Sequence, residues 1–212
     1  MVRKMLFEES PLFSKGMGFV EKMLFLRHQT TRKMNGFRKE IAIEAILYIA
    51  NRIERSDIHK ICKILYYADQ QHLSKYGRSI TGDTYIAMNY GPVPSNVEDI
   101  FKAVRGDSVF SPYVENIKND SFDFFNKFIL RPKREADLDY LSESDTECLD
   151  TAIAKCKDLS FQQLTELSHD LAWNNTQRDR AISVKDILRE QGDDEEYAEF
   201  IARKLEMENA AF

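Results

Sequence analysis

The sequence predicts an α+β fold that is mainly α-helical, in a single domain with one small antiparallel β-sheet of about three strands. Apolar residues recur every three or four positions over most of the chain, which is typical of helices packed on a common core. Short aromatic segments between turn-forming residues predict the strands. The chain of 212 residues, 43% hydrophobic and 31% charged, has the composition of one soluble domain with extensions.

Two helices should begin the domain. Residues 39–53 carry apolar side chains around so much of the helix that it must be largely buried. A break follows, and Ser56 or Asp57 can provide the N-cap of a helix that starts at Ile58. This second helix should end at Gly77, because glycine adopts without strain the left-handed conformation that follows a last turn. The two helices are expected to pack as an antiparallel hairpin.

The next segment predicts a turn, a strand, a rigid corner and a helix. Residues 81–83 (Thr-Gly-Asp) are typical of a turn, and residues 85–89 of a strand. The Gly-Pro-Val-Pro sequence at 91–94 should end that strand, since proline cannot donate a hydrogen bond to a ladder. Ser-Asn-Val-Glu at 95–98 has the spacing of a capping box, so a new helix should begin there.

Two more strands are expected in the middle of the chain. Residues 113–117 and 122–130 are aromatic and apolar, and they flank a polar turn at 118–121. Together with residues 85–89 they would form the small antiparallel sheet. Three strands on a helical layer are about the minimum for a stable sheet.

The C-terminal part should be helical again. Capping boxes at 144–147 (Ser-Asp-Thr-Glu) and 160–163 (Ser-Phe-Gln-Gln) predict the start of two helices. Ser183 should cap a third, short helix. Residues 191–212 are expected to form an acidic C-terminal helix with an apolar stripe.

Residues 1–37 differ from the rest, because lysine and arginine outnumber aspartate and glutamate there. One interpretation is a basic arm that contacts a partner or nucleic acid. The other, which we favour, is a poorly ordered N-terminal extension upstream of an original start at Met34. We therefore divide the chain into an extension at 1–37, a domain at 38–190 and the acidic helix at 191–212.

Three sequence blocks in the central region carry a family resemblance. KICKILYYAD at 60–69, YGRSITGD at 76–83 and YIAMNYGPVPSNV at 85–97 resemble the Panacea domain of the SocA-like antitoxins, which are often phage-associated or mobile-element proteins. The similarity continues more weakly through 141–145 and 166–173, so it covers roughly residues 38–190. The resemblance gives a structural role to Leu65, Tyr66, Ala68, Gly77, Gly82, Asp83, Gly91, Pro92, Val93, Pro94, His169 and Trp173.

The resemblance also implies a function. A SocA-like protein is expected to be the antitoxin of a toxin–antitoxin system and to neutralise a cognate toxin, encoded next to it, by direct contact. It could act by occluding the toxin or as an adaptor that delivers the toxin to an ATP-dependent protease. The oligomeric state stays open at this point.

A cluster of tyrosines suggests where such a partner would bind. Tyrosine is favoured at interfaces because its ring buries area while its hydroxyl stays solvated. We expect two or three members of this cluster to be exposed, with basic side chains at the rim. The candidate partner-binding residues are Tyr67, Tyr85, Met88, Tyr90, Lys75 and Arg78.

Catalytic and cofactor chemistry find little support in the sequence. The pairs His59 with Cys62 and His72 with Asp69 could be imagined as catalytic or metal-binding, but the chain has no HExxH, CxxC or HxxH arrangement. It also has no GxGxxG or GxxxxGK[ST] phosphate-binding motif. We expect no enzyme activity, no metal and no cofactor.

Composition and hydropathy bear on location and on the alternative function. Three cysteines without a CxxC pair are expected to be reduced thiols of a cytoplasmic protein. No apolar run reaches the ~18 residues that a membrane span needs, so we expect no membrane partner. The main alternative is a DNA-binding regulator of a phage or mobile element, with a helix-turn-helix formed by residues 38–77. A net charge of −5 argues against nucleic acid as the partner.

Overall fold

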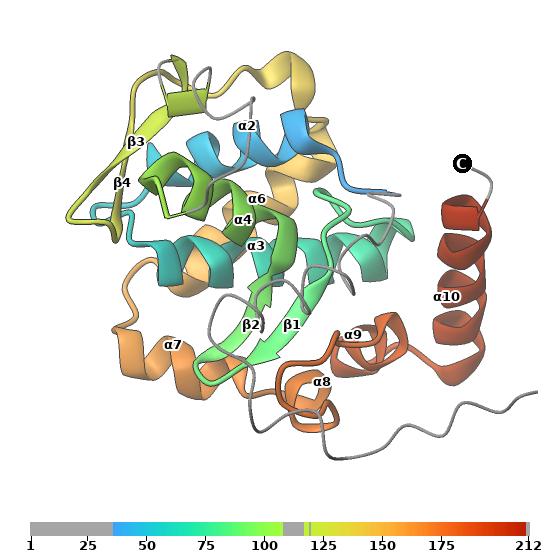
Figure 1. The fold of residues 1–212 in the computed structure, drawn as a ribbon. Coiled ribbons are helices and arrows are strands. Elements are labelled where there is room, and N and C mark those ends of the chain that lie inside the picture. Colours follow the sequence, from blue (N-terminus) through green and yellow to red (C-terminus); the bar gives the residue numbers. More distant parts are fainter. Residues whose placement is uncertain (1–35, 108–116, 119, 211–212) are drawn as a thin grey trace, which may run out of the picture. The chain divides into compact units, whose positions relative to one another are not determined.

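The structure is a computed structural model that describes residues 36–107, 117–118 and 120–210 (Figure 1). They belong to one compact unit, Gly36–Phe212. The predicted extension therefore lies outside the described residues, apart from its last two. The helices and strands in chain order are α2 (Lys39–Ala50), α3 (Ile58–Tyr76), β1 (Tyr85–Met88), β2 (Gly91–Pro94), α4 (Ser95–Arg105), β3 (Phe122–Phe125), β4 (Ile129–Pro132), a 3-10 turn (Leu138–Tyr140), α6 (Glu143–Cys156), α7 (Phe161–Ser168), α8 (Leu171–Asn174), α9 (Val184–Glu190) and α10 (Glu195–Ala210).

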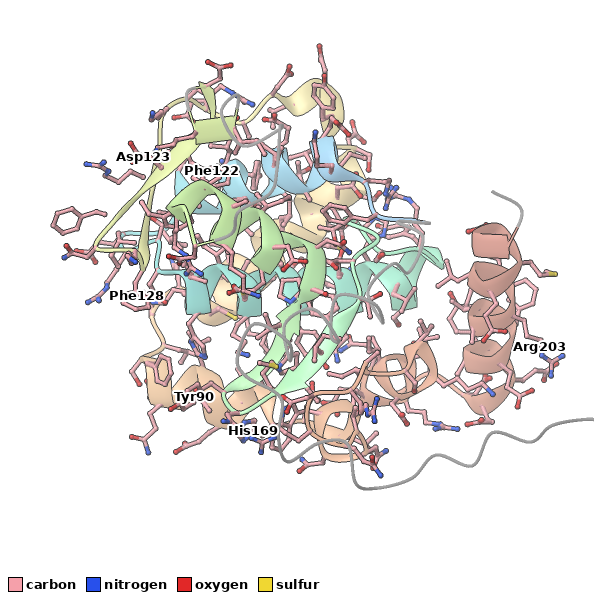
Figure 2. The ribbon with its side chains drawn as sticks, viewed as in Figure 1. Tyr90, Phe122, Asp123, Phe128, His169 and Arg203 are labelled. Atoms are coloured by element: carbon pink, nitrogen blue, oxygen red, sulfur yellow. The ribbon has the colours of Figure 1, made fainter. Side chains whose placement is uncertain are left out.

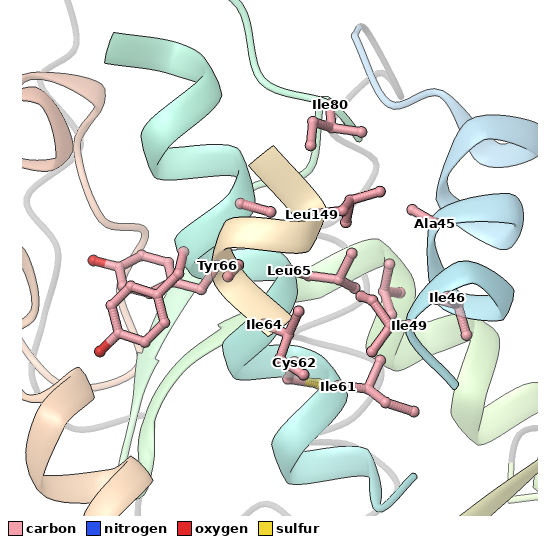
Figure 3. Close-up of a cluster of buried hydrophobic side chains, with 14 of the residues drawn as sticks. Ala45, Ile46, Ile49, Ile61, Cys62, Ile64, Leu65, Tyr66, Ile80 and Leu149 are labelled. Atoms are coloured by element: carbon pink, nitrogen blue, oxygen red, sulfur yellow. The ribbon is translucent and has the colours of Figure 1, made fainter. Parts of the chain in front are cut away.

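Helix α3 is the centre of the fold, and α2, α6, α7, α9 and strand β2 all pack against it (Figure 1). Twelve of its nineteen residues are buried. Figure 3 shows the apolar part of this contact, where Ile61 and Leu65 of α3 lie in one cluster with Ala45 and Ile46 of α2 and Leu149 of α6. The sequence predicts these limits correctly, because Asp57 caps the first turn and Gly77 follows the last with φ of 65°. Helix α2 ends at Ala50, three residues earlier than predicted.

The polar residues buried in α3 connect it to segments that come later in the chain. The Asp69 side chain is 3% exposed. One carboxylate oxygen accepts from the backbone N–H of Ile80 at 2.6 Å and of Thr81 at 3.1 Å. The other accepts from the hydroxyls of Thr81 at 2.5 Å and Tyr85 at 2.8 Å. A buried carboxylate is tolerated only when donors of this kind replace its water, so Asp69 fixes the path from α3 to β1.

His72 connects α3 to the first turn of α6. Its Nδ1–H donates to the carbonyl of Arg78 at 2.7 Å. Its Nε2 lies 3.0 Å from Ser144 Oγ and 3.0 Å from a carboxylate oxygen of Asp145. Both ring nitrogens of this fully buried histidine are therefore in contact with polar groups. The contacts join α3, the following loop and α6.

The strands confirm a mainly helical α+β fold but correct the predicted sheet. Four strands form two separate antiparallel hairpins, β1–β2 and β3–β4, in the part of the chain that the structure describes. The second edge of β1 is occupied by residues 179–182, which exchange backbone hydrogen bonds with Tyr85 and Ala87. No third strand could pair there, and β3 pairs with β4 instead.

Of the two strands predicted in the middle of the chain, the one at 122–130 is wrong, and most of the one at 113–117 lies outside the described residues. Residues 122–130 are not one strand, because the chain turns at Asn126 and Lys127, whose φ angles are 51° and 61°. Residues 113–116 lie outside the described residues, and Ile117 is buried in a short helical turn.

Two predicted capping boxes are wrong, and each has a physical reason. Helix α6 starts at the capping box of Ser142 with Asp145, two residues before the predicted one. Helix α4 starts at Ser95 as expected but has no cap from its own residues. Its first N–H groups, of Asn96 and Val97, donate to the carboxylate of Asp83 at 3.0 and 2.9 Å. The capping box at Ser160 and the cap at Ser183 are confirmed.

The Asp69→Ala variant should lower the free energy of unfolding by about 3–5 kcal/mol, since it leaves four buried donors without an acceptor. Tyr85→Phe removes only one of these donors and should cost about 1–2 kcal/mol. Urea unfolding followed by circular dichroism measures both. Equal losses for the two variants would mean that Asp69 does not act as the shared acceptor.

Candidate functional site

The β1–β2 hairpin is the candidate site, because two predicted contact residues, Met88 and Tyr90, lie at its tip. Its strands pair from Tyr85 with Pro94 to Met88 with Gly91, which leaves a two-residue turn of Asn89 and Tyr90. Such turns are typical of tight β-hairpins.

The first strand ends before residue 91, as predicted, but the predicted rigid corner at 91–94 is wrong, since these residues form strand β2. Ser95 N–H donates to the carbonyl of Thr84 at 2.9 Å. Because hydrogen-bonded and non-hydrogen-bonded pairs alternate along an antiparallel ladder, Pro92 and Pro94 then fall on non-hydrogen-bonded positions. Neither proline therefore occupies a position where the ladder requires a backbone N–H donor.

Lys63 of α3 connects the β1–β2 hairpin to the central helix. This lysine is fully buried, and its Nζ donates to the carbonyl of Pro92 at 2.8 Å. Burial penalises the ammonium and lowers the pKa of Lys63 to about 8. Gly91 is next to this amine, and its backbone has a φ of 91°. A Cβ on Gly91 would collide with Ser168 Oγ and come within 2.7 Å of Lys63 Nζ.

At the tip, one aromatic ring from α3 and one from α7 join the hairpin. Tyr90 is exposed, and its ring meets that of Phe161 edge-on at 5.3 Å between centroids. Phe161 also contacts the His59 ring at 4.1 Å. His59 Nε2–H donates to the carbonyl of Tyr90 at 3.2 Å. The tip of β1–β2 is thus fixed to the first turns of α3 and α7.

His59 is a neutral, poorly solvated histidine. Burial, together with the positive charge of Lys63, lowers the pKa of His59 to about 4. Its Nδ1 is buried and has no hydrogen-bond partner among the described residues. The ring therefore acts as a donor to Tyr90 and as a packing surface for Phe161.

His169 and Trp173 support the other side of the hairpin. Their rings are stacked at 3.7 Å and 11°, and Trp173 Nε1–H donates to the carbonyl of Met88 at 2.9 Å. His169 is the C-cap of α7, whereas Trp173 belongs to α8. The chain breaks at Asp170, which caps α8 and also accepts from the Tyr66 hydroxyl at 2.8 Å.

The structure does not bring the other predicted contact residues to this site. Tyr67 and Tyr85 are buried, so their choice as candidate partner-binding residues is wrong. Lys75 pairs with Glu147 at 2.8 Å, and Arg78 pairs with Asp145 at 3.0 Å. Lys75 is in the last turn of α3 and Arg78 follows the C-cap Gly77, whereas His59 is in the first turn of this helix. Sixteen residues of helix separate the two ends by roughly 24 Å.

Sequence reasoning missed Phe161 and treated His59 only as a candidate catalytic group. Phe161 directly follows the N-cap Ser160 and lies three positions before Leu164, a buried residue of α7. This spacing assigns Phe161 to the same face as Leu164, so its position in the sequence does not mark it as exposed.

The cysteine side chains are poor nucleophiles in this structure. Cys62, Cys148 and Cys156 are buried and unpaired. Burial raises the pKa of Cys148 and of Cys156 to about 11 and raises that of Cys62 further. Within the described residues there is no group of three His, Cys, Asp or Glu side chains that could hold a metal ion. The same residues include no helix that is both long and apolar enough to cross a membrane.

The fold and the site define a mainly helical α+β domain that is built on one buried central helix and presents an aromatic hairpin tip. The chain belongs to the family described as antitoxin SocA-like, Panacea domain, whose family model matches residues 61–174. This match covers more than half of the chain and includes both hairpins, from α3 to the end of α8. The family resemblance of the three sequence blocks is thus confirmed. Neither a curated protein nor a solved structure matches.

Gly91→Ala should destabilise the protein more than Gly106→Ala does. Both glycines have positive φ, of 91° and 80°, so both variants carry backbone strain of about 1–2 kcal/mol. Only at Gly91 does the added Cβ also collide with neighbours, whereas nothing lies within 4 Å of it at Gly106. We expect an additional loss of about 2 kcal/mol for Gly91→Ala in urea unfolding. Equal losses would exclude the contact of Gly91 with Lys63 and Ser168.

The protein should lose stability as the pH falls below about 6.5, the ordinary pKa of histidine. The pKa of His59 is about 4 in the folded protein, so between these values the unfolded chain binds a proton that the folded chain does not. The pKa of His169 is lowered as well, by burial, and acts in the same direction. Histidine titration by NMR, with His59→Gln for assignment, measures the first value. A His59 resonance that titrates near pH 6.5 would contradict its burial.

Proposed function

We propose that this protein is an antitoxin that neutralises a cognate toxin, encoded next to it, by direct protein–protein contact. The observation that carries the proposal is membership of the SocA-like antitoxin family across residues 61–174. The matched region contains the β1–β2 hairpin, whose tip exposes Met88 and Tyr90. Aromatic side chains that are both rigid and exposed are typical anchors of protein interfaces.

The proposal involves no catalysis, no metal and no cofactor. The expectation that the cysteines are not catalytic is supported by the raised pKa of all three thiols, which keeps them protonated near neutral pH. Occlusion of the toxin is the simplest mechanism for a protein that acts by contact. Reduced thiols are typical of the cytoplasm, where we expect the antitoxin to meet its toxin.

The alternative of a DNA-binding regulator is less well supported by the geometry. A helix-turn-helix made of α2 and α3 would use α3 as the recognition helix, which must offer a free face to the major groove. Helix α3 is instead covered by four helices and a strand, and Lys63 is turned into the interior. Its exposed Lys75 is paired with Glu147. Binding to another protein is therefore a better supported function than binding to DNA.

Co-expression of this protein with the product of the adjacent reading frame should restore growth that the product alone prevents. A pull-down should recover the two proteins as a complex, and immunoblotting should show unchanged amounts of toxin. A fall in toxin that depends on an ATP-dependent protease would indicate the adaptor mechanism instead of occlusion.

Two results would contradict the proposal. Growth rescue without any complex, together with specific binding of a promoter fragment, would establish the DNA-binding alternative. A folded protein that neither rescues growth nor binds the product would exclude the antitoxin function. Circular dichroism provides the control for folding in both cases.

A further inference from the structure

The tips of both hairpins are attached to consecutive residues at the start of α3. The Ile58 N–H donates to the carbonyl of Phe128, in the β3–β4 turn, at 2.9 Å. The next residue, His59, donates from its ring to the carbonyl of Tyr90, in the β1–β2 turn, at 3.2 Å. Figure 2 shows Phe128 and Tyr90 on the same side of the view, away from Arg203 of α10.

The β3–β4 tip is aromatic as well, and its rings face solvent. Phe122 and Phe124 of strand β3 pack inward, at 6.1 and 5.5 Å from the ring of Phe101. Phe125 and Phe128 at the turn are 54% and 66% exposed. Exposed phenylalanine is unfavourable in a chain that contacts only water, so two of them on one tight turn point to a contact surface.

The backbone of this turn is strained but well anchored. Lys127 has φ of 61°, which costs a residue other than glycine about 1 kcal/mol or more. Arg105 donates to the Lys127 carbonyl at 3.4 Å, and the Lys127 ammonium lies 3.2 Å from Asp107. Leu130 N–H donates to the Ser56 carbonyl at 2.9 Å, just before α3. The backbone that carries the two phenylalanines is therefore held in place before any partner arrives.

Two more exposed rings complete this surface beside the first turn of α3. Tyr90 is 61% and Phe161 is 52% exposed. Since an aromatic residue can bury 150–250 Å², the four rings together leave roughly 450 Å² uncovered. One partner in a standard interface buries about 800 Å², so the rings could supply more than half of it.

We infer that this aromatic end, formed by Tyr90, Phe125, Phe128 and Phe161, is the surface on which the toxin docks. The inference rests on the proposed function and specifies its binding site. The fitting partner is a folded protein with apolar pockets for the two hairpin tips, because rigid aromatic anchors bind best when they fill a pocket and exclude water. The predicted contact residue Tyr90 belongs to this surface, whereas Lys75 and Arg78 do not.

Three alanine variants and one matched control test this assignment. Phe128→Ala and Tyr90→Ala should each weaken binding at least tenfold, and Phe125→Ala should weaken it measurably. Phe200→Ala is the control, because Phe200 is 63% exposed but belongs to α10. That helix packs on α9 and, through the Tyr197 hydroxyl, on Ser74 at the other end of α3. The control should bind within twofold of the unmodified protein.

Binding is measured by biolayer interferometry with the purified product of the adjacent reading frame. Melting temperatures confirm that the variants fold, and size-exclusion chromatography with light scattering gives the oligomeric state. If the unmodified protein does not bind, the proposed function fails and this docking site fails with it. If it binds but the hairpin variants bind equally well, only the docking site is wrong. A homodimer that Phe128→Ala converts to monomer would show that a second copy covers this surface, which also overturns the inference.

Discussion

The buried carboxylate of Asp69 is the interaction on which the connection between the central helix and the rest of the domain depends. Its four hydrogen bonds fix the chain at Ile80, Thr81 and Tyr85. Asp83 then follows at the distance needed to cap α4. Lys63 holds the returning strand at Pro92. The β1–β2 hairpin and α4 are thus positioned by polar groups from two sides, while apolar packing supplies most of the stabilisation.

Local signals in the sequence were sufficient to predict the helices that begin or end with special chemistry. Asp57 and Gly77 delimit α3, and Ser160 and Ser183 start α7 and α9, because a cap acts within one turn of its own helix. The α+β class and the family followed from periodicity and from the sequence blocks between α3 and α8. These features depend on neighbours in the sequence, so a single chain reveals them.

The features that could not be predicted depend on contacts between distant residues. Tyr85 is buried because its hydroxyl reaches Asp69, sixteen positions earlier. The start of α4 is capped by Asp83, which lies outside the helix. Strand β2 tolerates two prolines only because of its register with β1. For the same reason the sequence predicts only part of the candidate site. The exposure of Tyr90 and the burial of Tyr67 are set by packing and not by residue type.

The attachment of both hairpin tips to α3 has a consequence for recognition. Loops that must be ordered on binding reduce the affinity, whereas rings that are already fixed keep more of their contact energy. Because Ile58 and His59 are adjacent in one helix, the backbone N–H of Ile58 and the ring of His59 together fix the spacing between the carbonyls of Phe128 and Tyr90. A partner with pockets at that spacing gains both anchors at once, and a partner with a different spacing gains only one. A rigid scaffold of this kind favours selectivity through geometry, and the strained turn at Lys127 is the local cost of presenting the rings in that position.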